Sequence, residues 1–166
     1  WMLGIPGSAV SEGLSTFRGA GRRMEYKGNF QGADVYDDYA HHPDEVRACA
    51  KSIKELYGDK KVTVLFQPHL FSRTADFYKE FAESLSMFDK VILVDIYPAR
   101  EKPIPGVTSK LIYDHLAPGV EKSMCSRADV LATVEKEKND IEILVSLGAG
   151  DIENEIAGMK EILKNR

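Results

Sequence analysis

The stretch Tyr36–Val46, YDDYAHHPDEV, marks the point where the chain changes from the pattern of a strand to that of a helix. Apolar residues after it recur at the spacing of one helix face: Val46, Cys49, Ala50, Ile53, Leu56 and Tyr57. Pro43 suits the first helical position, and Asp44 and Glu45 suit the positive end of a helix dipole. We therefore expect a strand, a polar loop over residues 37–43 and then a helix.

Strand and helix patterns alternate along the rest of the chain. Apolar strands are predicted at 61–66, 90–97 and 141–147, and a further short strand at 121–126. Helices predicted at 72–88, 109–116 and 127–138 separate these strands, and a last helix is predicted at 152–164. A helix at 7–17 and a hairpin of two short strands, 22–27 and 33–37, precede them. Such alternation is typical of a mostly parallel sheet covered on both faces. The sequence predicts an α/β fold, a three-layer sandwich with a short N-terminal β-hairpin.

Composition excludes several classes of function. The 166 residues are 43% hydrophobic and 29% charged, with a net charge of −4 and no basic run, which disfavours a nucleic-acid partner. The two cysteines, Cys49 and Cys125, stand in unrelated contexts, which disfavours a disulfide framework or a cysteine metal site. The sequence contains neither an apolar run of the roughly 20 residues that span a membrane nor a visible signal peptide. We expect a cytoplasmic protein without a membrane partner.

Four predicted loops follow directly after strands, at 37–43, 67–72, 95–106 and 148–151. The carboxyl ends of parallel strands meet at one edge of a sheet, and ligands of such folds bind there. The unusual polar residues of the chain concentrate in these loops. We therefore expect a binding site at this edge.

The acidic and imidazole groups of the first loop also have plainer interpretations. Asp37 and Asp38 are typical of turns, in which carboxylates only accept backbone hydrogen bonds. His41 and His42 are sequence neighbours and should point in different directions, which disfavours a shared metal ion. No metal ligand is therefore assigned.

The other loops carry weaker signals. His69 and Arg73 flank a predicted helix start, with Ser72 as a candidate cap, and this arrangement favours an anion. The GAGD turn at 148–151 lacks the full G-x-G-x-x-G pattern of dinucleotide sites. Residues 100–102, Arg-Glu-Lys, are expected to be loop surface. The sequence has neither a G-x-x-x-x-G-K-[ST] loop nor a nucleophile elbow, so a bound nucleotide would need a partner domain.

Five motifs occur in order: GRRMEY, VYDDYAHHPDEV, FQPHLFSRT, DIYPAREKPIPGVTSKLI and LGAGDI. Together they resemble the C-terminal domain of the UDP-N-acetylmuramate–L-alanine ligases, a branch of the Mur ligase family. The resemblance covers residues 15–166, and residues 1–14, which begin with Trp1, look like the tail of the preceding central ATPase domain. We therefore expect the chain to be a fragment with a domain boundary after residue 14.

The resemblance implies a Rossmann-like domain that closes over an active site shared with two others. The N-terminal domain binds the UDP-sugar, and the central domain holds most of the ATP and Mg²⁺ contacts. ATP converts the carboxylate of UDP-N-acetylmuramate to an acyl phosphate, which the amino group of L-alanine attacks, in a step of peptidoglycan synthesis. The partners of this chain are then its own N-terminal and central domains and these two substrates. The chain by itself should be inactive.

The resemblance also places individual residues. Four match positions near the nucleotide: Arg23, Asp38, Tyr39 and His41. Two match positions near the amino acid and the acyl phosphate: His69 and Arg73. Many members of the family have an arginine directly after the histidine of the F-Q-P-H element, where this chain has Leu70. That difference leaves Arg73 or another cation to meet the alanine carboxylate.

Three alternatives stay open at this point. The murein tripeptide ligases share a similar acid–aromatic–Ala-His-His-Pro stretch. A phosphoryl-accepting receiver domain would use Asp37, Asp38 and Asp95, but it needs a lysine after its last strand, where this chain has SLGAGD. A nucleotide-binding module without chemistry is the third.

Overall fold

The computed structural model describes residues 4–17 and 19–166. Over these residues, six strands form one sheet in the order β1-β2-β6-β3-β4-β5. Their bounds are β1 Glu25–Phe30, β2 Ala33–Asp38, β3 Val62–Phe66, β4 Lys90–Val94, β5 Glu121–Cys125 and β6 Ile143–Leu147. β1 and β2 pair antiparallel as a hairpin, and all other neighbours are parallel.

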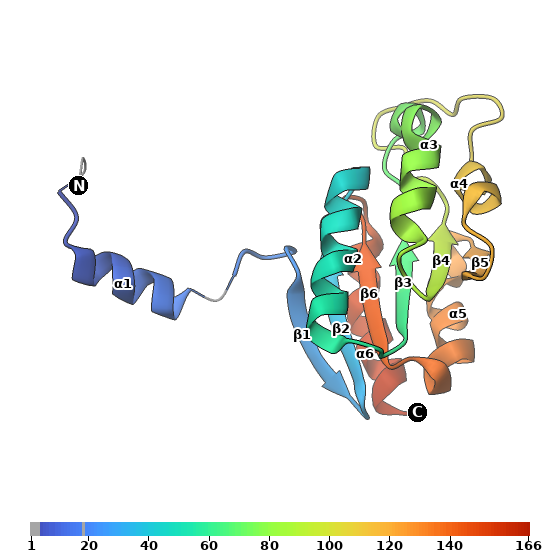
Figure 1. Cartoon of the computed structure of the whole chain (residues 1–166). Coiled ribbons are helices and arrows are strands. Elements are labelled where there is room, and N and C mark those ends of the chain that lie inside the picture. The colour runs from blue at the N-terminus through green and yellow to red at the C-terminus, as the bar shows by residue number, and fades with distance from the viewer. Residues whose placement is uncertain (1–3, 18) are drawn as a thin grey trace.

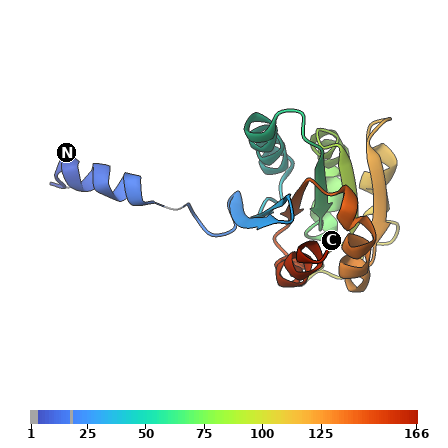
Figure 2. The ribbon, with the colours of Figure 1, turned by 90° about the horizontal axis from the view of Figure 1, so that it is seen from below.

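Helices cover both faces of this sheet (Figures 1 and 2). One face carries α2 Pro43–Tyr57, α3 Phe71–Leu85 and α4 Lys110–His115, and the other carries α5 Val130–Glu137 and α6 Ile156–Lys164. Short 3-10 turns at Arg127–Asp129, Lys138–Asp140 and Ile152–Glu155 flank the last two helices. The predicted α/β three-layer sandwich with an N-terminal β-hairpin is confirmed.

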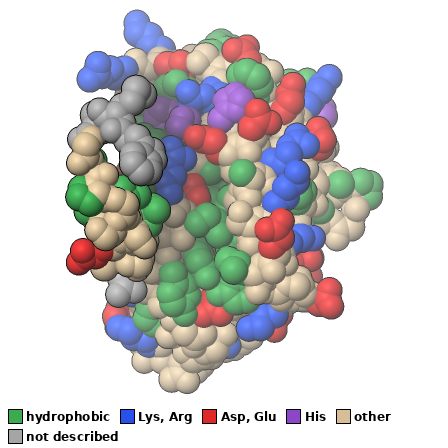
Figure 3. All heavy atoms as spheres, turned by 60° about the vertical axis from the view of Figure 1, so that its left-hand side comes forward, with side chains coloured by type: hydrophobic (Ala, Val, Ile, Leu, Met, Phe, Trp, Pro, Cys, Tyr) green, Lys and Arg blue, Asp and Glu red, His purple; other side chains and the backbone are tan. Residues whose placement is uncertain are grey.

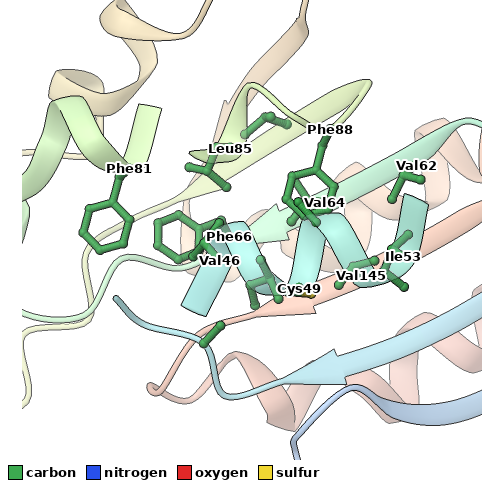
Figure 4. Packing of buried hydrophobic residues seen from close by; sticks show 14 of the residues in the cluster. Val46, Cys49, Ile53, Val62, Val64, Phe66, Phe81, Leu85, Phe88 and Val145 are labelled. Atoms are coloured by element: carbon green, nitrogen blue, oxygen red, sulfur yellow. The ribbon is translucent and has the colours of Figure 1, made fainter. Parts of the chain in front are cut away.

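The core has two layers because the side chains of each strand alternate between the two faces. On the α2–α3 face, Phe66 of β3 and Phe81 of α3 are fully buried, with ring centroids 5.3 Å apart (Figure 4). Leu65, the neighbour of Phe66, faces α5 and α6 instead. Full burial of such side chains stabilises the fold by about 1.5–3 kcal/mol each, so the sheet is a rigid support for its loops.

The N-terminal helix α1, Gly7–Thr16, stands apart from the sheet (Figures 1 and 2). It contains no buried residue, and its side chains Val10 and Leu14 are exposed. Trp1, with the rest of residues 1–3, lies outside the described residues. The boundary after residue 14 stays a prediction. None of the helices in the described residues is both long and apolar enough to cross a bilayer.

The first strand of the hairpin begins later than the predicted 22–27. Arg22 and Met24 have φ values of 55° and 47°, which a strand does not accommodate, and β1 starts at Glu25. The reason is a distant contact, because the Met24 N–H donates to the Asp38 carboxylate at 2.8 Å. The predicted strand at 90–97 is also too long, since β4 ends at Val94.

Candidate functional site

The carboxyl ends of β2, β6 and β3 lie side by side. Leu147 at the end of β6 is in register with Asp38 on one side and with Phe66 on the other. The chain leaves β2 and β3 toward the face of α2 and α3, but it leaves β6 toward the face of α6. Sheets of this kind bind ligands where the chain departs in opposite directions. The predicted edge therefore coincides with the switch point of the sheet.

Asp38 holds the first loop in shape. It is 6% exposed, and its carboxylate accepts the N–H groups of Met24 and Ala40, each at 2.8 Å. The Gly148 N–H donates to the Asp38 carbonyl at 3.1 Å, which joins this loop to the turn after β6. Both carboxylate oxygens are already engaged, so a ribose hydroxyl would have to share them with backbone amides.

The neighbouring Asp37 is buried in an ion pair that sequence reasoning missed. Arg22 Nε lies 3.2 Å from Asp37 Oδ2 and 2.8 Å from Glu153 Oε2, and Arg22 Nη2 donates to the Gly148 carbonyl at 2.6 Å. Burial raises the pKa of Asp37, and the charge of Arg22 opposes that shift. The two adjacent arginines, Arg22 and Arg23, could have indicated this ion pair, but the sequence did not show which of them binds an acid inside the domain.

Arg23 and Tyr39 lie on the open side of the same loop. The Arg23 side chain is 51% exposed and reaches Glu45 at 3.3 Å. The guanidinium carbons of Arg22 and Arg23 lie 4.9 and 5.7 Å from the centroid of the Tyr39 ring. An exposed guanidinium beside an aromatic ring is a suitable surface for a nucleotide.

Glu45 fixes the start of α2 and with it His41. Glu45 Oε2 accepts the N–H groups of His41 and His42 at 2.9 and 3.2 Å. Burial alone would raise the pKa of Glu45, but the hydrogen bond from the His41 amide and the contact with Arg23 outweigh it and lower that pKa. The His42 ring packs against Phe77, whereas the His41 ring faces His69, so the neighbouring histidines do point in different directions.

The rings of His41, His69 and Tyr97 form a row across three loops. The His41 and His69 centroids are 6.0 Å apart, and Tyr97 stacks on His69 at 5.6 Å and 20°. Arg73 Nη1 lies 3.3 Å from His69 Nδ1. Because a guanidinium can only donate, Nδ1 accepts and Nε2 carries the proton. Burial, with the nearby charges of Arg73 and His41, lowers the pKa of His69, so this ring is neutral at pH 7.

The start of α3 differs from the prediction. Ser72 is not the cap, because the helix begins at Phe71 and Leu70 occupies the N-cap position with a φ of 74°. The Leu70 N–H donates to the Tyr97 carbonyl at 2.9 Å, and the Tyr97 N–H donates to the Pro68 carbonyl at 2.8 Å. These bonds hold the turn that places His69 and Arg73 side by side.

The GAGD turn packs tightly beneath this row. The Gln67 amide donates to Asp151 at 2.9 Å and accepts the Ile152 N–H at 3.2 Å. A Cβ on Gly150 would lie 2.4 Å from Gln67 Oε1 and 2.7 Å from Tyr97 Cγ. Gly150 therefore allows two loops to pack closely. This packing accounts for the glycine in the turn without a dinucleotide-binding role.

The acids of the receiver alternative do not form one cluster. Asp37 pairs with Arg22, Asp38 binds backbone amides, and the exposed Asp95 accepts the Arg127 N–H at 3.2 Å. Over residues 4–17 and 19–166, no group of three or more His, Cys, Asp or Glu side chains could hold a metal ion. Figure 3 shows instead a mixed edge, with histidines among basic and acidic side chains.

Comparison with known proteins identifies a family for this chain. The family model described as Mur ligase, glutamate ligase domain, matches residues 22–152. A UDP-N-acetylmuramate–L-alanine ligase from Phocaeicola vulgatus is 52% identical over 99% of this chain and 36% of that protein. One from Paenarthrobacter aurescens is 51% identical over 90% of this chain and 32% of that protein.

A solved structure agrees with these sequence relatives. The crystal structure of a UDP-N-acetylmuramate–alanine ligase from Thermotoga maritima matches with a TM-score of 0.70 and 27% identity, over 99% of this chain and 34% of that one. The chain thus spans about a third of the length of the relatives it matches.

Proposed function

Because this chain belongs to the Mur ligase family, we propose that it is the C-terminal domain of an ATP-dependent ligase that joins L-alanine to UDP-N-acetylmuramate. The observation that carries the proposal is the 52% identity, over nearly the whole chain, to a relative that bears this name. The ligase would act in peptidoglycan synthesis in the cytoplasm, where ATP is available. The remaining two thirds of the enzyme would be the N-terminal and central domains.

The reaction needs an activated carboxylate and a nucleophilic amine. ATP, bound with Mg²⁺ mainly by the central domain, supplies the phosphoryl group that activates the carboxylate of UDP-N-acetylmuramate. The sequence of this chain contains no phosphate-binding loop, so its own residues act on the outer side of the nucleotide and on the amino acid. The carboxyl edge of the sheet is the surface that would close over them.

Arg23, Tyr39 and His41 would meet the nucleotide. The exposed guanidinium of Arg23 and the ring of Tyr39 offer charge and a stacking surface, and Glu45 holds His41 in place. Asp38 contributes mainly by fixing this loop, since it binds the amides of Met24 and Ala40. Any contact of Asp38 with the ribose would be made in addition to these two backbone hydrogen bonds.

His69 and Arg73 would meet the amino acid and the acyl phosphate. A guanidinium binds carboxylate or phosphoryl oxygens bidentately, and its charge stabilises the negative charge that develops as the amine attacks. His69 is neutral and presents Nε2–H as a donor, because Arg73 occupies Nδ1. Leu70 contributes no charge, so Arg73 is the residue of this turn that would hold the alanine carboxylate.

The test is product formation by the full-length polypeptide that contains this chain. The enzyme is incubated with ATP, Mg²⁺, UDP-N-acetylmuramate and L-alanine, and products are identified by mass spectrometry. We expect UDP-N-acetylmuramoyl-L-alanine, with one phosphate released per molecule and none when either substrate is omitted. A product formed only when a murein tripeptide replaces alanine would assign the recycling reaction, and no product with either would refute the proposal.

A further inference from the structure

We propose that Glu101 is a positioning residue for this reaction. Its carboxylate caps the first turn of α3 and so fastens the loop after β4, residues 95–109, to the start of this helix. This inference rests on the proposed function, because the groups it positions are His69 and Arg73. Glu101 itself would touch neither substrate.

The first turn of α3 requires a cap from elsewhere. The first N–H groups of a helix have no partner within the helix, and polar N-cap side chains usually supply one. Here the N-cap residue is Leu70, whose side chain cannot accept a hydrogen bond. The Ser72 N–H donates instead to Glu101 Oε2 at 3.0 Å, and the Ser72 hydroxyl donates to Glu101 Oε1. The cap thus comes from a residue 29 positions later in the chain.

The backbone conformation before Glu101 directs its carboxylate toward Ser72. Ala99 has a φ of 49°, and the Glu101 N–H donates to the Pro98 carbonyl at 2.8 Å, which turns the chain back toward α3. A positive φ in a residue other than glycine is strained, and such strain persists only where surrounding contacts hold it. The flanking side chains of Arg100 and Lys102 are exposed. Glu101 therefore differs from the loop surface to which the sequence assigned it.

The loop after β4 holds the segment around His69 at two points. The backbone of Tyr97 bonds to Pro68 and Leu70, and the Tyr97 ring stacks on the imidazole. Glu101 binds Ser72, in the same helical turn as Arg73. Hydrogen bonds from Ser72, with a smaller contribution from the charge of Arg73, lower the pKa of Glu101. The Glu101 carboxyl group is therefore ionised at neutral pH. Loss of Glu101 would free this turn and leave the Tyr97 contacts in place.

The experiment uses the full-length polypeptide with Glu101→Ala, Glu101→Gln and a matched control, Glu142→Ala. Glu142 also accepts a backbone N–H, that of Lys61 at 2.8 Å, but at the opposite edge of the sheet. We expect Glu101→Ala to lower kcat/KM for alanine about 10- to 100-fold, since small displacements of positioning groups have effects of this size. The KM values for ATP and UDP-N-acetylmuramate should stay within about twofold. Glu101→Gln keeps an oxygen for the Ser72 N–H and should stay within about fivefold of wild type.

Two further readouts separate positioning from general instability. Hydrogen exchange of peptides over residues 68–77 should accelerate in Glu101→Ala and stay unchanged in Glu142→Ala. Adding Ser72→Ala to Glu101→Ala should cause no further loss of kcat/KM, because both residues belong to one contact.

The inference is overturned if Glu101→Ala matches wild type in kcat/KM for alanine. It is also overturned if Glu101→Ala and Glu142→Ala lose kcat equally with every KM unchanged. Failure of the proposed function has a different signature, because the wild-type polypeptide would then form no alanine product. In that case, unchanged hydrogen exchange over residues 68–77 in Glu101→Ala would show that Glu101 does not hold the first turn of α3. Faster exchange would support that role.

Discussion

Adjacent residues of the same type have different tasks in this site. Arg22 is enclosed by Asp37, Glu153 and the Gly148 carbonyl, whereas the next residue, Arg23, is half exposed. Both guanidinium groups lie near the Tyr39 ring, but the two arginines differ in exposure and in their ion-pair partners. Substrate contacts are therefore expected from the exposed member of the pair.

Substitution of Arg73 should affect the amino acid more than the nucleotide. In the full-length polypeptide, Arg73→Ala should lower kcat/KM for alanine about 10- to 1000-fold, the range typical of a lost transition-state contact. Lys79→Ala removes an exposed cation from the same helix and should have no effect. Steady-state phosphate release at varied alanine measures both, and an unchanged value for Arg73→Ala would remove the role assigned to Arg73.

Gly150→Ala should destabilise the fold. The added methyl group would meet Gln67 Oε1 and the Tyr97 ring at distances below 3 Å, so the two loops must separate. Overpacking of this kind costs about 1–3 kcal/mol, and the melting temperature should fall by several degrees. Gly13→Ala, on the open side of α1 with nothing within 4 Å, is the matched control and should not lower it.

At the scale of the element, the start of α2 depends on one carboxylate. Glu45 accepts two amides there, and its folded pKa lies below the ordinary 4.5. Such a group contributes stability that is fully present above the unfolded pKa and is lost as pH falls through the folded value. The contribution is about 0.5–1 kcal/mol, because a third of the side chain is exposed.

Glu45→Gln should therefore lower the urea midpoint at pH 7 and have a smaller effect near pH 3. Urea unfolding of the two proteins at several pH values measures the difference between them. A difference that is as large at pH 3 as at pH 7 would show that the Glu45 charge does not stabilise the helix start.

Periodicity predicted the elements well and their ends less well. Apolar spacing located α2, and near-continuous apolar runs located β3, β4 and β6. The start of β1 and the cap of α3 could not be predicted, because Asp38 and Glu101 determine them from positions distant in sequence. Local patterns carry no information about such contacts.

At the scale of the molecule, the sequence predicted that the polar loops share one edge but not which of them are neighbours. That depends on β6, the last strand, lying between β2 and β3. This order places the GAGD turn between the first two loops and brings Gln67 to Asp151. The resemblance to Mur ligases supplied the candidate residues, and their roles toward substrates remain predictions.

The chain alone should be inactive. It lacks a phosphate-binding loop, and in the proposed enzyme most nucleotide contacts belong to the central domain. We expect no alanine-dependent phosphate release from the 166 residues and no ATP binding at micromolar concentrations by calorimetry. Turnover by the chain alone would contradict the proposal that the central domain makes most of the contacts to ATP.

In the proposed enzyme, the carboxyl edge of the sheet faces the reacting groups. Hydrogen exchange of the full-length polypeptide, with and without UDP-N-acetylmuramate and a non-hydrolysable ATP analogue, compares both edges in one experiment. We predict that ligands protect residues 38–42 and 67–73 and leave the opposite edge, 58–61 and 117–120, unchanged. Protection confined to the opposite edge, or absent from both while the ligands are bound, would contradict the account.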